Sequence, residues 1–79
     1  MPEEITAAEI AQHYSAAGDS VTLINELVAL SERNADEVDT VRRNVEHLEI
    51  MVAKDFWTTE DLAPFNAAIT AGTAVLPAE

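Results

Sequence analysis

The stretch that decides the fold is NADEVDTVRRNVEHLEIMVAK, residues 34–54. Apolar residues recur in it every three or four positions, the spacing that places side chains on one side of an α-helix. At about 100° per residue these positions fall within an arc of roughly 80°, and together they form an apolar seam. The seam consists of Val38, Val41, Val45, Leu48 and Val52. It is only about two and a half heptads long, shorter than a free-standing coiled coil, so we expect it to pack inside a helical bundle.

Capping signals mark where the helices begin. Asn34 with Glu37 three residues later is typical of a helix start, and so is Thr6 with Glu9. In both pairs the first side chain can accept a hydrogen bond from a free backbone N–H, and the glutamate can reach back. Thr58 is expected to cap the last helix in the same way.

Stop signals complete the division of the chain. Gly18 and Gly72 are expected to end helices, because glycine readily adopts the left-handed conformation common at helix ends. Pro64 cannot donate a backbone hydrogen bond, so a kink is expected one turn into the last helix. The predicted helices cover residues of about 6–17, 20–32, 35–54 and 59–71, followed by a frayed tail at 73–79. The sequence thus predicts an all-α fold, a small bundle of four short helices with a central antiparallel helical hairpin, in a single domain over 1–79.

Composition limits the classes of partner. The 79 residues include 15 Asp or Glu and 4 Lys or Arg, a formal net charge of −11. Such a surface repels phosphate groups, so we expect no direct nucleic-acid binding and no membrane binding. No apolar run approaches the roughly 20 residues needed to span a bilayer, and the start MPEE lacks the basic region of a signal peptide. We therefore expect a cytoplasmic protein, in the producing or the host cell.

The residues give no pattern for catalysis or for a cofactor. His13 and His47 fall on different predicted helices, and Ser15 points to another face than His13. The only glycines are Gly18 and Gly72, too few for a phosphate-binding loop, and there is no cysteine. We expect no enzyme activity, no metal and no cofactor.

Three residues are candidates for a partner surface: Ile50, Phe56 and Trp57. Ile50 lies about 160° around the helix from the middle of the apolar seam. It is either an ordinary exposed apolar residue or part of a second packing surface. The pair of Phe56 and Trp57 is either core or part of a partner surface, and Trp57 is favoured as core because it can pack against Leu62 across the helix start.

The segment AKDFWTTEDLAPFNAAITAG, within residues 46–72, combines an aromatic pair, a Thr-capped acidic turn, a proline and an Ala-rich helix. It resembles small acidic helical proteins encoded by tailed bacteriophages and prophages, most of which have no assigned function. The resemblance implies a genomic context and no activity.

These observations favour a non-catalytic interaction or accessory module that acts by helix–helix contacts with a protein partner or with itself. A chain of this size buries a small core, and a homodimer would enlarge it. The alternative is an acidic decoy, a nucleic-acid mimic that blocks a basic site on a host or phage protein.

Overall fold

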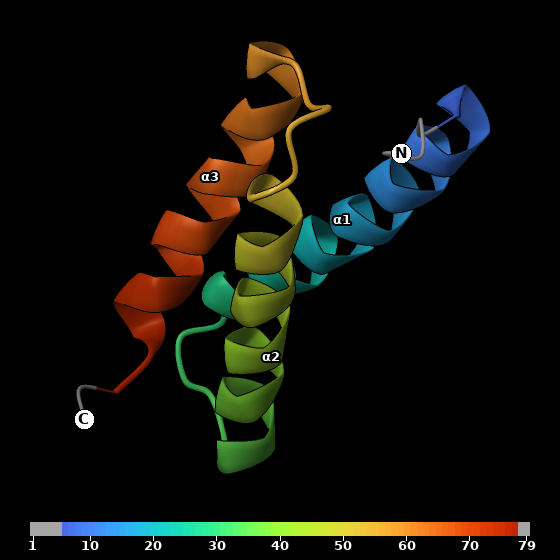
Figure 1. Ribbon diagram of the computed structural model, residues 1–79. Coiled ribbons are helices and arrows are strands. Elements are labelled where there is room, and N and C mark those ends of the chain that lie inside the picture. The colour runs from blue at the N-terminus through green and yellow to red at the C-terminus, as the bar shows by residue number, and fades with distance from the viewer. Residues whose placement is uncertain (1–5, 78–79) are drawn as a thin grey trace.

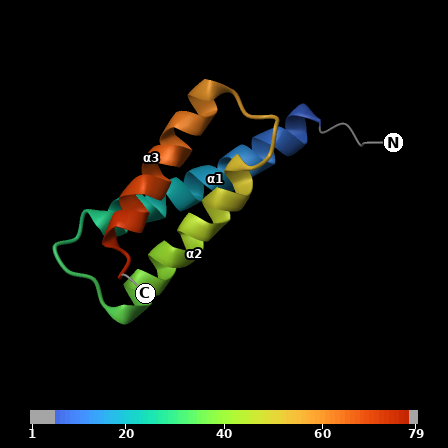
Figure 2. The same cartoon turned by 60° about the vertical axis from the view of Figure 1, so that its left-hand side comes forward.

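The computed structural model describes residues 6–77. Within them the chain forms three α-helices, α1 (Ala7–Val28), α2 (Ala35–Val52) and α3 (Thr59–Val75), and no strand. Successive helices reverse direction, and each packs against the other two (Figures 1 and 2). The all-α class is confirmed, whereas the described residues hold three helices and not the predicted four. The predicted tail lies partly outside the described residues, at Ala78 and Glu79.

The correction concerns α1, which joins the first two predicted helices into one. Gly18 lies inside this helix, and no described glycine has a positive φ. Apolar positions continue in one register across Gly18, so the same stripe faces the bundle on both sides of it. The stripe comprises Ile10, Ala17, Val21, Ile24 and Val28, all of them buried or packed against the core. Packing along the whole stripe offsets the cost of about 1 kcal/mol that glycine carries in a helix.

The start of α2 follows the sequence closely. Asn34 Oδ1 accepts from the Glu37 N–H at 2.8 Å, and Glu37 Oε1 accepts from the Asn34 N–H at 3.0 Å, a reciprocal cap. The helix ends at Val52, two residues before the predicted end. At the start of α1, Thr6 Oγ1 accepts from the Glu9 N–H at 3.1 Å as expected.

The course of α3 differs from the prediction at two places. The helix runs without interruption through Pro64, and it continues past Gly72 to Val75. Gly72 is buried, and its missing side chain lets α3 approach α1 and α2 closely. It therefore serves packing and does not end the helix. Thr58 caps the start as predicted, accepting from the Asp61 N–H at 3.1 Å, and Asp61 accepts in return from the Thr58 N–H at 3.3 Å.

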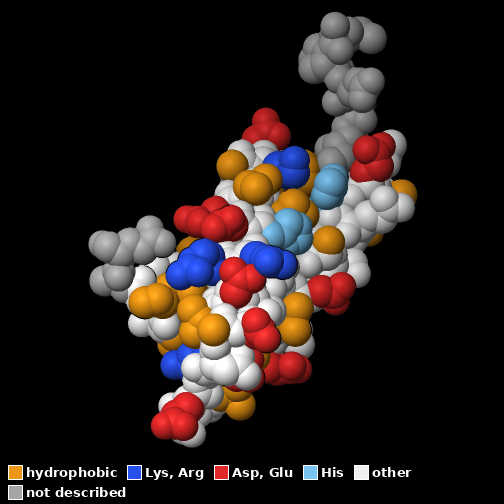
Figure 3. Space-filling view, turned by 90° about the horizontal axis from the view of Figure 1, so that it is seen from below, with side chains coloured by type: hydrophobic (Ala, Val, Ile, Leu, Met, Phe, Trp, Pro, Cys, Tyr) orange, Lys and Arg blue, Asp and Glu red, His pale blue; other side chains and the backbone are white. Residues whose placement is uncertain are grey.

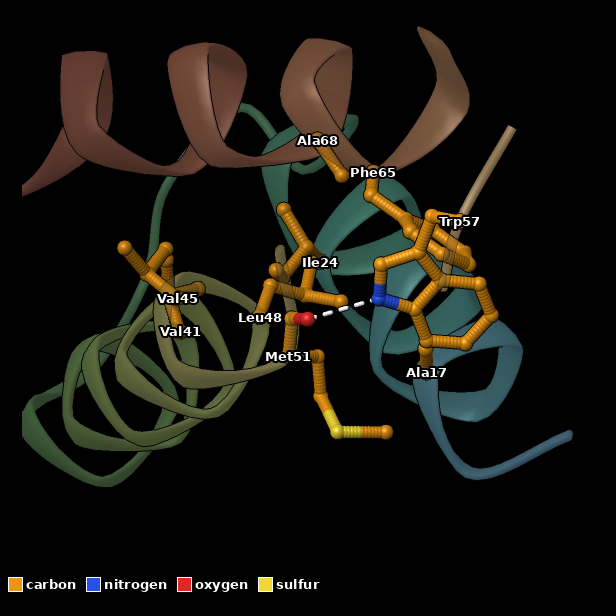
Figure 4. Packing of buried hydrophobic residues seen from close by; sticks show 9 residues of the cluster. All are labelled: Ala17, Ile24, Val41, Val45, Leu48, Met51, Trp57, Phe65 and Ala68. Carbon is orange, nitrogen blue, oxygen red and sulfur yellow. Dashed lines mark hydrogen bonds between the residues drawn. The ribbon is translucent and has the colours of Figure 1, made fainter. Parts of the chain in front are cut away.

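The core lies where the three helices meet (Figure 4). Three residues of the predicted seam, Val41, Val45 and Leu48, are buried, and Val52 packs at the edge of the core. The seam thus packs inside the bundle, and it meets both α1 and α3. The other buried apolar residues are Ala17, Ile24, Met51, Trp57, Phe65 and Ala68.

Candidate interaction surface

Of the three predicted surface residues, Trp57 is held most firmly. Its side chain is only 8 % exposed, and its indole Nε1–H donates to the Met51 carbonyl oxygen at 2.6 Å (Figure 4). The ring also meets Phe65 edge-on, with centroids 5.1 Å apart, and Phe56 at 4.6 Å. This hydrogen bond ties the α2–α3 connection to the last turn of α2, so Trp57 is part of the core.

Phe56 occupies the edge of the same aromatic cluster. It is partly buried, and its ring stacks on that of His13 of α1 with a centroid distance of 5.7 Å. Tyr14, one position further along α1, approaches both Trp57 and Phe65 at 6.3 and 5.8 Å. The cluster therefore joins the first half of α1 to the start of α3, and little of Phe56 remains for a partner.

Ile50 lies apart from this cluster, on the outer side of α2. With 65 % of its surface exposed, it is the most exposed large hydrophobic residue described. Leu48, two positions earlier, is fully buried, so the side of α2 that carries Ile50 points away from the core. Ile50 and Trp57 therefore do not form one continuous surface.

A hydrogen bond between α1 and α2 was not visible from the sequence. Ser20 Oγ lies 2.8 Å from His47 Nδ1, although the residues are 27 positions apart. Such a pair can activate a serine for nucleophilic attack, but that chemistry needs a hydroxyl that the substrate can reach. Ser20 is only 4 % exposed, so this pair serves as a contact between the helices.

The titratable side chains do not converge on a metal site. In residues 6–77, no group of three or more His, Asp or Glu side chains is placed to hold a metal ion. His13 packs on Phe56 and His47 bonds to Ser20, so each histidine has a structural contact. Nor is any helix of the described chain long and apolar enough to cross a membrane.

The basic residues of the protein are confined to one part of the chain. All four Lys and Arg lie within residues 33–54, that is, in α2 and its flanking residues. The same segment holds five of the 15 acids, and the remaining 57 residues hold ten acids and no Lys or Arg. Figure 3 shows the basic side chains interspersed with acidic ones on one face, with the histidines beside them. The segment 33–54 is therefore nearly balanced in charge, in contrast to the rest of the chain.

Two oppositely charged pairs on α2 have the spacing of one helical turn. Arg43 Nε lies 2.9 Å from Asp39 Oδ2 and forms an ion pair. Arg42 and Glu46, at the same spacing, do not form one. The guanidinium of Arg42 and the carboxylate of Glu46 thus stay available to charges outside the helix.

Comparison with protein-family models, with characterised proteins and with solved structures finds no match to this chain.

Proposed function

We propose that this protein is a non-catalytic helical interaction module that acts through an exposed helix face. The observation that carries the proposal is Ile50, a large apolar side chain held in solvent on a rigid helix. Its neighbours along the helix include the exposed charged residues Glu46, Glu49 and Lys54. An apolar centre with a polar rim is typical of protein–protein contacts. The acidic and basic side chains of α2 would orient a partner on this face and select among partners.

Site-specific photo-cross-linking tests this function. A photoreactive residue replaces Ile50 in the full chain, and a matched variant carries it at Ala67, which is exposed on α3. Irradiation in the producing cell is expected to give discrete adducts of higher mass from position 50 and none from position 67. Equal labelling at the two positions, or no adduct at position 50, would refute an interaction through this face.

A second function, an acidic decoy for a basic site on another protein, is supported by the ten acids outside 33–54. Regularly placed carboxylates can imitate the phosphates of a nucleic acid. A decoy's complex should be displaced by duplex DNA and should weaken steeply with salt. Retention of the partner in about 0.5 M NaCl, beyond the range of exposed charge attraction, would contradict the decoy.

We also propose, on the resemblance of residues 46–72, that the protein comes from a tailed phage or prophage. Because no apolar run in the sequence approaches the roughly 20 residues needed to span a bilayer, we propose that it works in the cytoplasm. Sequencing the flanking DNA tests this origin. Genes for phage structural or lysis proteins on either side are expected, and a flanking region of purely metabolic genes would contradict it.

A further inference from the structure

We propose that the partner is a second copy of this chain, bound through the outer face of α2. This inference rests on the proposed function and names its partner. The outer α2 face is defined by five residues at alternating spacings of four and three, Asp39, Arg43, Glu46, Ile50 and Ala53. Two copies would place these faces against each other about a twofold axis.

The geometry of this face suits helix–helix packing. Its positions fall within an arc of roughly 80°, centred about 140° around the helix from the buried seam. Four of the five residues are exposed, and Asp39 is half-exposed. Residues at this spacing line one side of a helix, and two of these five, Ile50 and Ala53, are apolar while the other three are charged. α2 therefore presents one stripe to its own bundle and a second one outward.

Charge favours a second copy here over α1 and over the first turn of α3. Two molecules with a net charge of −11 repel each other wherever acids meet acids. On α1 and in the first turn of α3 the charged side chains are all acidic. The segment 33–54 carries four bases and five acids, so approach along α2 avoids most of this repulsion.

The outer face is also complementary to itself. Arg43 and Glu46 are both exposed and lie next to each other along the stripe. In an antiparallel pair with the twofold axis between them, Arg43 of one copy faces Glu46 of the other, and the reverse. Ile50 then lies about 8 Å from the axis along the helix, close enough to be covered by the second copy.

One competing surface is the outer side of α3. No residue in the segment 62–77 is charged, so this side does not repel a second copy. Its exposed residues are Ala, Thr, Asn and Pro, however, and none is a large apolar side chain. Burial of such small side chains removes little apolar area from water, whereas Ile50 offers a large one. The experiment below decides between the two faces.

Sedimentation equilibrium of the full chain tests the inference with two matched variants. The average mass of the wild type is expected to rise from 8.6 kDa toward twice that value between about 1 and 500 µM, the range of a small, transient interface. Ile50→Glu should weaken dimerisation at least roughly tenfold. Ala67→Glu adds the same charge on α3 and should leave it unchanged. Both positions are exposed, so both variants should keep the wild-type circular dichroism spectrum. Loss of the dimer in Ala67→Glu but not in Ile50→Glu would overturn the α2 assignment.

Charge reversal tests the twofold arrangement. Glu46→Arg lowers the net negative charge, so a dimer limited only by overall repulsion would tighten. In the proposed pairing, the arginine introduced at position 46 instead faces Arg43 of the other copy, and dimerisation should weaken several-fold. The double variant Arg43→Glu/Glu46→Arg restores the opposition and should return the dissociation constant to within about threefold of the wild type. A tighter Glu46→Arg dimer, or a double variant that stays weak, would overturn the arrangement.

A wild type that stays monomeric over the whole range overturns self-association itself. In that case cross-linked adducts from position 50 that contain another protein would leave the interaction function standing. A monomeric wild type whose position-50 variant also gives no cross-linked adduct would refute both self-association and the interaction function.

Discussion

The two glycines lie inside helices but have opposite surroundings. A Cβ atom built on Gly18 meets no atom within 4 Å, whereas one built on Gly72 would lie 2.6 Å from Val45 Cγ2 and 3.1 Å from Ile24 Cγ2. Gly18 therefore contributes only flexibility to the unfolded chain, while Gly72 makes room for two neighbouring helices. The same substitution should change stability in opposite directions at the two sites.

Gly18→Ala is expected to stabilise the protein by about 0.5–1 kcal/mol, because alanine loses less backbone entropy on folding and has open space here. The free energy of unfolding from urea titration, followed by far-UV circular dichroism, is the measurement. A destabilised Gly18→Ala would mean that the backbone at this position is not helical in solution.

Gly72→Ala is expected to destabilise the protein by about 1–3 kcal/mol, because the new methyl group forces α3 away from Val45 and Ile24. The same titration measures it, and Ala67→Gly, at an exposed position of α3, serves as the control for a change in helix propensity alone. An unchanged unfolding free energy in Gly72→Ala would show that the helices are packed more loosely than the structure has them.

Trp57→Phe tests the hydrogen bond to Met51. The indole donates to a carbonyl that also accepts from the Lys54 N–H at 3.1 Å, so phenylalanine removes one bond and part of the buried volume. A loss of about 1–3 kcal/mol is expected from the unfolding free energy. Tyr14→Phe removes only an exposed hydroxyl, and its effect should stay within about 0.5 kcal/mol. Equal effects of the two changes would argue against a structural role for the indole N–H.

At the scale of single residues, the sequence predicted which side of its helix a residue faces better than which residues of other helices it contacts. Helical periodicity placed Leu48 inside and Ile50 outside, because both follow from angles on one helix. It did not predict that Ser20 meets His47, because their distance depends on how α1 and α2 cross. The nearly balanced charge of the segment 33–54 could have been found from the sequence, since all four Lys and Arg lie there.

At the scale of helices, the starts near residues 6, 35 and 59 were predicted correctly, the start near residue 20 was wrong, and the ends were predicted poorly. The caps at Thr6, Asn34 and Thr58 depend on side chains within three residues, so local sequence determines them. The predicted ends at Gly18 and Gly72 were wrong, because glycine permits a helix end without requiring one. Tertiary packing decided both cases, through the continuous stripe of α1 and the close approach of α3.

The end of α1 depends on a residue beyond the helix. Arg33 Nη1 donates to the carbonyl oxygens of Leu30, Leu27 and Val28 at 2.8, 3.1 and 3.4 Å. The last carbonyls of a helix lack their full set of intrahelical partners, although the Leu27 oxygen also accepts from the Leu30 N–H at 3.2 Å. A positive charge here favours the negative end of the helix dipole.

Arg33→Ala is therefore expected to lower the unfolding free energy by about 1 kcal/mol, measured by urea titration. Lys54→Ala removes the same charge from an exposed site whose side chain makes no hydrogen bond to another described residue, and should change it by less than about 0.5 kcal/mol. If the two substitutions had the same effect, net charge and not the cap would explain the loss.

At the scale of the molecule, a small apolar core has to offset the repulsion caused by a large excess of negative charge. Burial among three helices supplies the favourable free energy, while repulsion among the acids opposes the compact state. The sequence predicted the all-α class, and the excess charge follows directly from its composition. It did not predict the number of helices, because that number depends on whether α1 continues through Gly18.

This balance makes stability depend on ionic strength. Raising NaCl from about 0.01 to 0.3 M shortens the Debye length from roughly 30 Å to below 10 Å, which screens the repulsion. The melting temperature at low micromolar concentration, followed by circular dichroism, should therefore rise by several degrees. The variant Asp19→Asn/Glu26→Gln removes two exposed charges on α1. Its melting temperature at low salt should be higher than that of the wild type, and the increase with salt should be smaller. A melting temperature that falls with salt would show that attractive ion pairs outweigh repulsion. The described residues contain one ion pair, Asp39–Arg43, and an exposed pair of this kind contributes little to stability, so such a fall would contradict the structure.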